Sequence, residues 1–387
     1  MFKKLLYNFF ALNIIAYYIR SYLIRYPAPS NIGYFWNYGS LAIFFLVIQI
    51  VSGLFLAMFY TPHIDYAFTS IEHIMDNLSY GWLIRYLHAN GASFFFFVVY
   101  IHILRGIFYS SYKFPRTNLW ISGITIYFLL MGTAFLGYVL PWGQMSFWAA
   151  TVITNFVTVI PFIGEELVYW IWGGYSINNA TLNRFFCLHF LFPFIVAILV
   201  ALHLFLLHQT SSSTELQLKL NLNTKLSFFP YFIIKDLVTV LLFTLLVSLV
   251  IFYTPEIFNH SINYVPANPL VTPSHIVPEW YFLPFYAILR SILNKTLGIV
   301  TMILSMAILY LFPVIDQSIN GINVFIGYYR MIFWFFAWNF VYLGFLGSQT
   351  AEYPCVELGL FCTLIHLIYC FIYLNIIKYL DYTILNL

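Results

Sequence analysis

Charged residues are scarce in this chain: Asp, Glu, Lys and Arg make up only 7% of its 387 residues, whereas 62% are hydrophobic. A soluble domain is typically about 25% charged and about 45–50% apolar. The composition therefore excludes a soluble globular protein and predicts a polytopic membrane protein. A chain of this length can hold about eight spans of ~20 residues with their connecting loops.

Cysteine and intramembrane acids are also scarce. The four cysteines form no CxxC pair and mostly lie in apolar stretches, which favours packing roles over redox or metal chemistry. The apolar stretches hold almost no acidic residues, and no inverted repeat is visible. Both absences argue against a secondary transporter, which would need midplane acids and broken helices.

The apolar stretches predict an all-α polytopic membrane protein with eight transmembrane helices. We expect them at about residues 36–60, 81–110, 117–140, 180–208, 232–253, 296–313, 327–346 and 355–378. Twelve of the 16 Lys and Arg residues then fall on one side if the N-terminus is inside, which favours that orientation. We divide the chain into a mildly amphipathic N-terminal surface segment (1–35), a four-helix bundle with the first outer loops (36–225) and a C-terminal four-span region (226–387).

Two of the expected spans carry paired histidines: His88 and His102 on the second, His189 and His203 on the fourth. Both intervals are 14 residues, which advance a helix about 21 Å and return to within about 40° of the starting direction. Each pair therefore lies on one helix face, near opposite ends of a bilayer core roughly 30 Å thick. Because the two spans are parallel, His88 should face His189 near the outer side, and His102 should face His203 near the inner side.

Glycines repeat the same interval on the other two spans of the predicted bundle. Gly39 and Gly53 are 14 residues apart on the first span, as are Gly123 and Gly137 on the third. Glycine weakens a helix, so its use indicates close approach of something bulky. Ordinary small-residue packing is the alternative for any one of them. Four matched intervals on consecutive spans favour a shared cause.

Two facing imidazoles at each level suit the axial positions of a haem better than zinc, which takes three or four protein ligands. The glycines would make room for the haem edges. Arg85 lies three residues before His88 and Arg105 three after His102, each toward the nearer membrane surface. Both are expected to pair with haem propionates, although snorkelling at helix ends is an alternative. Two stacked haems would form a transmembrane electron conduit.

Several longer motifs accompany the histidines: GWLIRYLHANGAS at 81–93, YIHILRG at 100–106, GYVLPWGQMSFWAATVITN at 137–155 and PEWYFLPFYAILRS at 278–291. With these motifs the chain resembles the cytochrome b family, the haem-bearing core subunits of ubiquinol–cytochrome c oxidoreductases (bc1 complexes, respiratory complex III). The resemblance extends from about Trp36 to the last span. Shorter photosynthetic relatives split this core into two chains and use a longer second histidine interval, so the uninterrupted chain favours the respiratory form.

The resemblance implies a function and its partners. Ubiquinol would be oxidised at an outer site, one electron would cross the membrane through two bis-histidine haems b, and quinone would be reduced at an inner site, coupled to proton translocation (the Q cycle). The implied partners are the Rieske iron–sulfur protein, cytochrome c1 and other bc1 subunits in a dimeric complex, together with membrane lipids. The implied location is the mitochondrial inner membrane, and no nucleic-acid partner is expected.

The resemblance also implies residues for two quinone sites. Glu279 and Tyr281 of the PEWY segment, Tyr138 and the amphipathic stretch 143–157 would form the quinol-oxidation pocket, with Glu279 accepting a proton. By composition alone, Glu279 could equally be a solvated loop acid. His208 and Asp236, with Lys235 nearby, would form the quinone-reduction site. Without the resemblance, they could be an exposed loop pair.

Two departures from the family pattern carry expectations of their own. Ala149 stands where the family usually has glycine, so the quinol pocket should be narrower and less sensitive to strobilurin-type inhibitors. Leu293 replaces a common proline, so the segment after PEWY is expected to continue as helix. A two-haem transmembrane ferric or ascorbate-type reductase is the other enzyme considered; it would have four to six spans and no PEWY segment.

Overall fold

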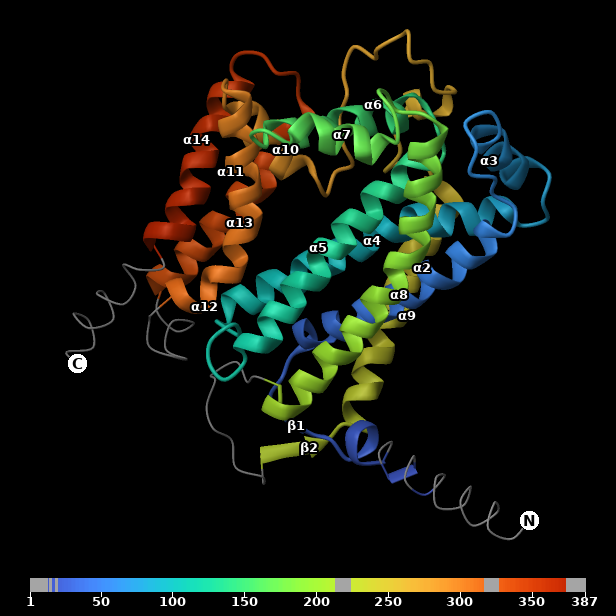
Figure 1. Ribbon diagram of the computed structural model, residues 1–387. Coiled ribbons are helices and arrows are strands. Elements are labelled where there is room, and N and C mark those ends of the chain that lie inside the picture. Colours follow the sequence, from blue (N-terminus) through green and yellow to red (C-terminus); the bar gives the residue numbers. More distant parts are fainter. Residues whose placement is uncertain (1–12, 14–15, 18–19, 213–223, 317–326, 374–387) are drawn as a thin grey trace.

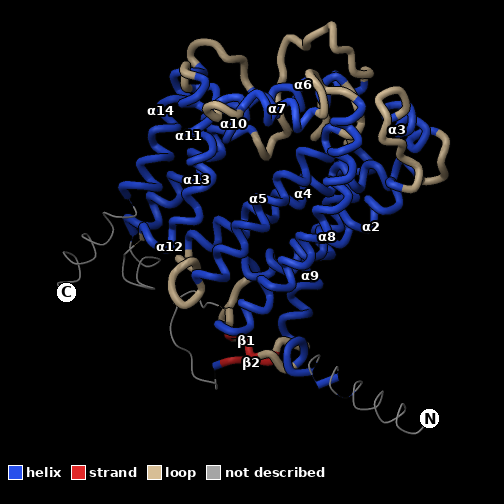
Figure 2. Tube along the Cα trace, viewed as in Figure 1, coloured by secondary structure: helices blue, strands red, loops and turns tan. Residues whose placement is uncertain are grey.

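The computed structural model describes residues 13–373 except 14–15, 18–19, 213–223 and 317–326, and the described chain is mostly helical (Figure 1). Two short strands, β1 (Pro27–Pro29) and β2 (Lys225–Ser227), pair in antiparallel fashion at one end of the molecule (Figure 2). The expected all-α fold therefore has one small sheet added. Residues 1–12, 14–15 and 18–19 of the predicted N-terminal surface segment lie outside the described residues.

Seven helices of the described chain are long and apolar enough to cross a membrane, which confirms the polytopic helical fold. They are Tyr34–Ala57 (a 3₁₀ turn leading into α2, Tyr38–Ala57), α4 (Gly81–Phe108), α5 (Thr117–Val139), α8 (Asn179–Thr210), α9 (Tyr231–Tyr253), Lys295–Ile315 and Tyr329–Ser348. The sixth comprises α11 (Lys295–Ala307), a 3₁₀ turn (Ile308–Leu311) and α12 (Phe312–Ile315), and the seventh lies in α13 (Gly327–Ser348). The eighth expected span is shorter in its described part: α14 (Cys355–Ile368) continues as a π-helix (Tyr369–Tyr373).

Shorter helices lie at the end of the molecule where α4 and α8 begin (Figure 1). They are α3 (Ala67–Asp76), α6 (Gln144–Thr154), α7 (Gly164–Trp172) and α10 (Leu283–Ser291), with 3₁₀ turns at Asn155–Val159 and Ser261–Tyr264; a π-helical turn (Arg20–Ile24) precedes β1 at the opposite end. By the charge-based orientation, the helical cap faces the outer side of the membrane and the small sheet faces the inner side.

The long helices form two groups. In the first, α2 packs against α4, α5 packs against α8, and α9 packs against α2 and α4, around a core that includes Phe45, Phe96 and Tyr127. In the second, α10, α11, α13 and α14 pack together beside the bundle (Figure 1). Although α9 follows residue 226, its packing joins it to the helices before that point.

A buried ion pair joins the two groups at the inner end. Lys113, in the loop between α4 and α5, lies 3.0 Å from the carboxylate of Asp316, and their side chains are only 7% and 0% exposed. Tyr112 donates a hydrogen bond to the same carboxylate. Nearby, the indole N–H of Trp120 donates to the carbonyl of Leu309 at 2.7 Å. Because removing one partner of a buried pair leaves an uncompensated charge, this contact fixes the α4–α5 loop against α12.

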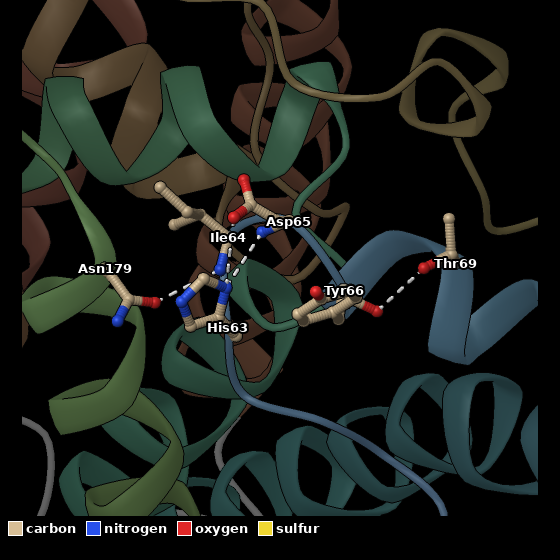
Figure 3. Close-up of polar contacts among 6 residues, drawn as sticks. All are labelled: His63, Ile64, Asp65, Tyr66, Thr69 and Asn179. Atoms are coloured by element: carbon tan, nitrogen blue, oxygen red, sulfur yellow. Dashed lines mark hydrogen bonds and ion pairs between the residues drawn. The ribbon is translucent and has the colours of Figure 1, made fainter.

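At the outer end, the loop between α2 and α3 is tied to the start of α8 (Figure 3). The backbone N–H of Ile64 donates to the side-chain oxygen of Asn179 at 3.1 Å. His63 Nδ1 accepts from the backbone N–H of Asp65 at 3.3 Å and lies 3.6 Å from its carboxylate, with both side chains exposed. Thr69 donates to the carbonyl of Tyr66 at 3.1 Å, within the first turn of α3. These contacts order a surface loop and do not form a buried site.

The prediction that the helix after the PEWY segment continues through Leu293 is wrong. The helix α10 ends at Ser291, because Ile292 has an extended backbone (φ −107°, ψ 116°), and Leu293 is 97% exposed. Asn294 then accepts a hydrogen bond from the backbone N–H of Leu297 at 2.9 Å, which caps the start of α11. The cap at the start of α11 sets the end of α10, and the lack of a proline at position 293 did not lengthen α10.

Candidate haem and quinone sites

The structure brings the four intramembrane histidines of α4 and α8 together in two pairs. The ring centres of His88 and His189 are 6.2 Å apart with planes at 83°, and those of His102 and His203 are 6.5 Å apart at 62°. A metal held by two imidazole nitrogens at about 2.0 Å, with each ring centre ~1.1 Å further away, needs ring centres roughly 6.2 Å apart. Both pairs fit the axial ligation of a haem iron.

The second nitrogen of three of these rings is engaged by the neighbouring helix. Ser52 Oγ lies 2.9 Å from His88 Nδ1 and itself donates to the carbonyl of Ile48 at 2.6 Å, so Nδ1 must be the donor. Ser122 repeats the arrangement with His203, at 2.9 Å. His189 Nδ1 donates to the carbonyl of Thr133 at 2.8 Å. Each bond leaves Nε2 unprotonated, as a metal ligand requires.

His102 differs from the other three. Its Nδ1 lies 3.1 Å from Nη2 of Arg105, and a guanidinium can only donate. Arg105 Nε is buried and has no hydrogen-bond partner among the described residues, and its guanidinium lies 5.5 Å from the ring of Trp36. A buried cation with an unused donor beside the inner histidine pair fits an anionic group, such as a propionate, at that level.

Each of the four spaced glycines lies directly against one of the histidines. A Cβ on Gly53 would lie 3.0 Å from His88 Cε1, one on Gly123 would lie 3.0 Å from His203 Cε1, and one on Gly39 would lie 3.3 Å from His102 Cε1. Gly137 is tightest, since its Cβ would lie 2.8 Å from His189 Nδ1 and 3.0 Å from Nε2. The imidazoles therefore lie against these glycines, and the expected room for haem edges stays a prediction.

These distances predict unequal tolerance of alanine. Gly137→Ala should force the His189 ring out of its position, because real Cβ atoms do not approach a ring this closely. Gly39→Ala at 3.3 Å needs only a small shift and is the matched control. We expect Gly137→Ala to lose at least half of the outer-level haem signal in a redox-resolved optical spectrum of the purified complex. Equal spectra for the two variants would contradict this account of the glycines.

Two adjoining cavities flank the outer histidine pair, with about 780 Å³ and 1050 Å³ of space between side chains, including their open mouths. The two cavities have seven lining residues in common: Gln49, Arg85, His88, Gly137, Pro141, His189 and Pro193. The shared wall places Arg85, the expected propionate partner, at the edge of the space between the two imidazoles.

The larger cavity also holds the predicted quinol-site residues, since Glu279, Tyr281 and Tyr138 all line it. Burial raises the pKa of Glu279 to about 7, although the charge of Arg85 partly opposes the shift. Burial also holds the pKa of Tyr281 well above its ordinary value. The Tyr281 ring stacks on Phe96 with centres 4.0 Å apart and planes at 4°. The PEWY segment and Tyr138 of α5, which are far apart in sequence, thus meet beside the outer histidines.

The helix α6 packs under the loop that precedes the PEWY segment. The backbone N–H of Gln144 donates to the carbonyl of Val265 at 2.9 Å, and the backbone N–H of Ser146 donates to the side-chain oxygen of Asn263 at 2.9 Å. Asn263 itself lines the larger cavity. Ala149 lies on the buried face of α6, 5% exposed, and is outside the lining of that cavity. Any narrowing by its methyl group would therefore act through the packing of α6.

The predicted inner-site residues lie around the N-terminal segment that contains β1. His208, in the last turn of α8, stacks on Tyr26 with ring centres 4.3 Å apart and planes at 14°. Lys235 Nζ donates to the carbonyl of Ile32 at 2.6 Å. Asp236 lies near Ser40 and Lys235 at the start of α9. The segment from Tyr26 to Ile32 thus connects the ends of α8 and α9.

Sequence reasoning missed several residues of these sites. Ser52 and Ser122 each precede one of the spaced glycines, so a repeated Ser-Gly pair in apolar spans was an available signal. Gln49 lines both outer cavities, and its buried Nε2 has no partner among the described residues. A polar amide inside a span was its signal. No signal in the sequence indicated Tyr26, because His208, on which it stacks, is 182 positions away.

The fold and these sites define an integral membrane protein of transmembrane helices with two stacked histidine pairs. The chain matches two family models, described as "Cytochrome b/b6/petB" over residues 23–211 and "Cytochrome b(C-terminal)/b6/petD" over residues 266–367. The chain belongs to the cytochrome b family, and haem b binding is inherent to that family.

Individual relatives agree with this assignment. Cytochrome b of Acanthamoeba castellanii is 53% identical over 353 residues, covering 91% of this chain and 92% of the relative. Cytochrome b of Mycosarcoma maydis is 56% identical over 339 residues, covering 88% and 86%. The solved structure of a "Hyperthermophilic respiratory Complex III" includes a chain of 34% identity with a TM-score of 0.89, covering 95% of this chain and 97% of that one. These matches favour a respiratory cytochrome b over a secondary transporter or a ferric reductase.

Proposed function

We propose that this chain is the electron-transferring core subunit of a ubiquinol–cytochrome c oxidoreductase. It would oxidise ubiquinol at an outer site and reduce quinone at an inner site, with two haems b between them. The observation that carries the proposal is the larger cavity, which is lined by one histidine pair and by Glu279, Tyr281 and Tyr138. A site for quinol oxidation must place an electron acceptor and a proton acceptor on the same substrate, and this cavity supplies positions for both.

The haem ligands would be His88 with His189 at the outer level, and His102 with His203 at the inner level. Haem b, when bound, would supply one-electron transfer between the two levels. Ser52, Ser122 and the carbonyl of Thr133 hold the ligand rings by their Nδ1 atoms, which fixes the tautomer and limits ring rotation. Gly39, Gly53, Gly123 and Gly137 let the rings pack against the neighbouring helices. Arg85 and Arg105 would neutralise propionates.

At the outer site, Glu279 would accept a proton from the quinol hydroxyl. A carboxyl whose pKa is about 7 is half ionised at neutral pH, so it can take up a proton and release it again. The stack of Tyr281 on Phe96 holds the PEWY segment against α4. Tyr138, from α5, lines the same cavity. Many of the side chains that line the cavity are apolar, which suits a quinone ring.

At the inner site, His208 and Asp236 would hydrogen-bond the two carbonyls of the quinone and deliver protons, with Lys235 nearby. The short approach of Lys235 to the carbonyl of Ile32 anchors this part of α9 to the N-terminal segment. The two proposed sites would lie toward opposite ends of α8, since Glu279 lines a cavity with His189 and His208 is in the last turn of that helix. Oxidation would release protons on the outer side and reduction would take them up on the inner side.

The remaining features of the proposal follow from the family. The complex would contain the Rieske iron–sulfur protein and cytochrome c1, would be dimeric, and would reside in the mitochondrial inner membrane. Within the chain, residues 36–225 would form the haem-binding bundle, residues 226–387 the C-terminal region with the PEWY loop, and residues 1–35 a surface segment. The structural match to a complex III chain supports an assembly of this kind.

The deciding experiment is a redox titration of the purified native complex, followed by reduced-minus-oxidised optical spectra. Two b-type haems with separated midpoint potentials are expected. A single b-type haem would show that one histidine pair is structural and that the transmembrane electron path is wrong. A complex without haem would overturn the proposal.

A further inference from the structure

One backbone carbonyl of the PEWY segment lacks the donor that its neighbours have. The segment forms a turn that leads into α10, in which each carbonyl accepts from the backbone N–H three positions later: that of Glu279 from Phe282 at 2.8 Å and that of Trp280 from Leu283 at 3.2 Å. The next donor in this series would be Pro284, which has no N–H. In the described chain, no backbone N–H donates to the carbonyl of Tyr281.

The side chain of Tyr100, on α4, supplies the missing donor. Its hydroxyl donates to the carbonyl of Tyr281 and accepts in turn from the hydroxyl of Tyr127, on α5, at 3.4 Å. A carbonyl left without a partner among apolar side chains would cost free energy comparable to a lost hydrogen bond. Two transmembrane helices are therefore joined to the backbone of the PEWY segment through one chain of hydroxyl groups.

Aromatic neighbours hold the Tyr100 ring in place. Its centre lies 6.1 Å from that of Trp280 and 5.6 Å from that of Phe340 on α13, both in edge-to-face geometry. Phe96, which precedes Tyr100 by one helical turn, stacks on the ring of Tyr281. One face of α4 thus contacts Tyr281 twice, through a ring stack and through a hydrogen bond.

We propose that Tyr100 is a positioning residue of the quinol-oxidation site. Its hydroxyl replaces the N–H that Pro284 cannot provide, and it thereby fixes the turn from which Glu279 and Tyr281 reach the cavity beside the outer histidines. Tyr127 orients that hydroxyl toward the carbonyl. The inference rests on the proposed function of the larger cavity, and it adds to that site two hydroxyl groups that lie outside the lining of the cavity.

Tyr100→Phe in the intact purified complex keeps the ring and removes the hydroxyl. We expect kcat/KM for decylubiquinol to fall about three- to tenfold, mainly through a higher KM, because the Tyr281 carbonyl loses its donor and the turn that lines the cavity shifts. Tyr127→Phe should have a smaller effect in the same direction, since it removes only the longer bond. The matched control is Tyr310→Phe, which removes a hydroxyl that lies 3.0 Å from that of Thr125, outside the lining of both cavities.

Replacement of Pro284 tests the mechanism by rescue. Pro284→Ala restores an N–H three positions after Tyr281, so the double variant Tyr100→Phe/Pro284→Ala should recover most of the lost kcat/KM, while Pro284→Ala alone should stay within about twofold of wild type. If Tyr100→Phe acted only by weakening helix packing, loss of the Pro284 ring, which lies beside Gly344, would add to the defect. Additive losses in the double variant would overturn the inference.

Optical spectra of both haems first establish that each variant is assembled; if Tyr100→Phe fails to assemble, the kinetics of Tyr127→Phe decide. Wild-type kinetics in the assembled variants would overturn the inference. Glu279→Gln separates the inference from the proposed function. If Glu279→Gln keeps wild-type turnover, the proposed role of the outer cavity fails. If Glu279→Gln loses turnover while the two tyrosine variants behave as wild type, only the inference about Tyr100 fails.

Discussion

Replacement of His189 by leucine is expected to leave the purified complex with one b-type haem in place of two. The His88 ring would remain, but a bis-imidazole site needs both axial nitrogens, and the ring centres of this pair are 6.2 Å apart across the proposed iron position. Leucine fills a similar volume without a ligand atom, so the bundle should persist. Haem content per complex should fall by half, measured by extraction and by the loss of one step in a redox titration.

A histidine outside the bundle provides the control. His73 lies on α3 and is exposed, with its Nδ1 beside the side-chain amide of Asn77 at 3.1 Å. His73→Leu should retain both haems. Full haem content in His189→Leu would contradict ligation by the outer pair, whereas loss of both haems in His189→Leu alone would mean that the two levels assemble cooperatively.

Replacement of Glu279 by glutamine is expected to have the largest effect on turnover. Glutamine keeps the size of the side chain but cannot accept a proton, and removing a general base typically costs about 10²-fold or more. The wild-type rate should rise as the pH passes about 7, because burial raises the Glu279 pKa to that value and only the ionised form accepts the proton. Below that pH the carboxyl is protonated and the rate should fall.

The test is steady-state quinol oxidation between pH 5.5 and 8.5 for wild type and Glu279→Gln. The variant should lose both the rate and the rise near neutral pH. Glu72→Gln, an exposed acid on α3, should match wild type. A Glu279→Gln enzyme with an unchanged pH profile would show that another group accepts the proton.

Much of the fold could be predicted because it follows from local patterns. Apolar runs of about 20 residues with few charges allow only membrane helices, since lipid leaves no other way to satisfy the backbone. The 14-residue histidine interval fixes a helix face, and the alternation of spans fixes which histidines pair. Both pairings are as expected in the structure. Cytochrome b membership could be predicted as well, because the PEWY and GWLIRYLHANGAS segments are contiguous.

Other features depended on contacts between distant segments, which no local period encodes. The close approach of Gly137 to His189 and the buried pairing of Lys113 with Asp316 depend on how helices pack. So does the convergence of Glu279 and Tyr138 in one cavity. The end of α10 at Ser291 was decided by the cap of the following helix.

The sequence by itself thus determined the class of protein, its spans and the four histidines, because helix periodicity and hydrophobicity are properties of neighbouring residues. Only the tertiary structure decided what surrounds them. The serines at Nδ1, the glycine contacts and the stack of Tyr26 on His208 each join residues dozens to nearly two hundred positions apart. Such contacts depend on how whole helices pack against one another, and they cannot be predicted from the spacing of side chains along one helix.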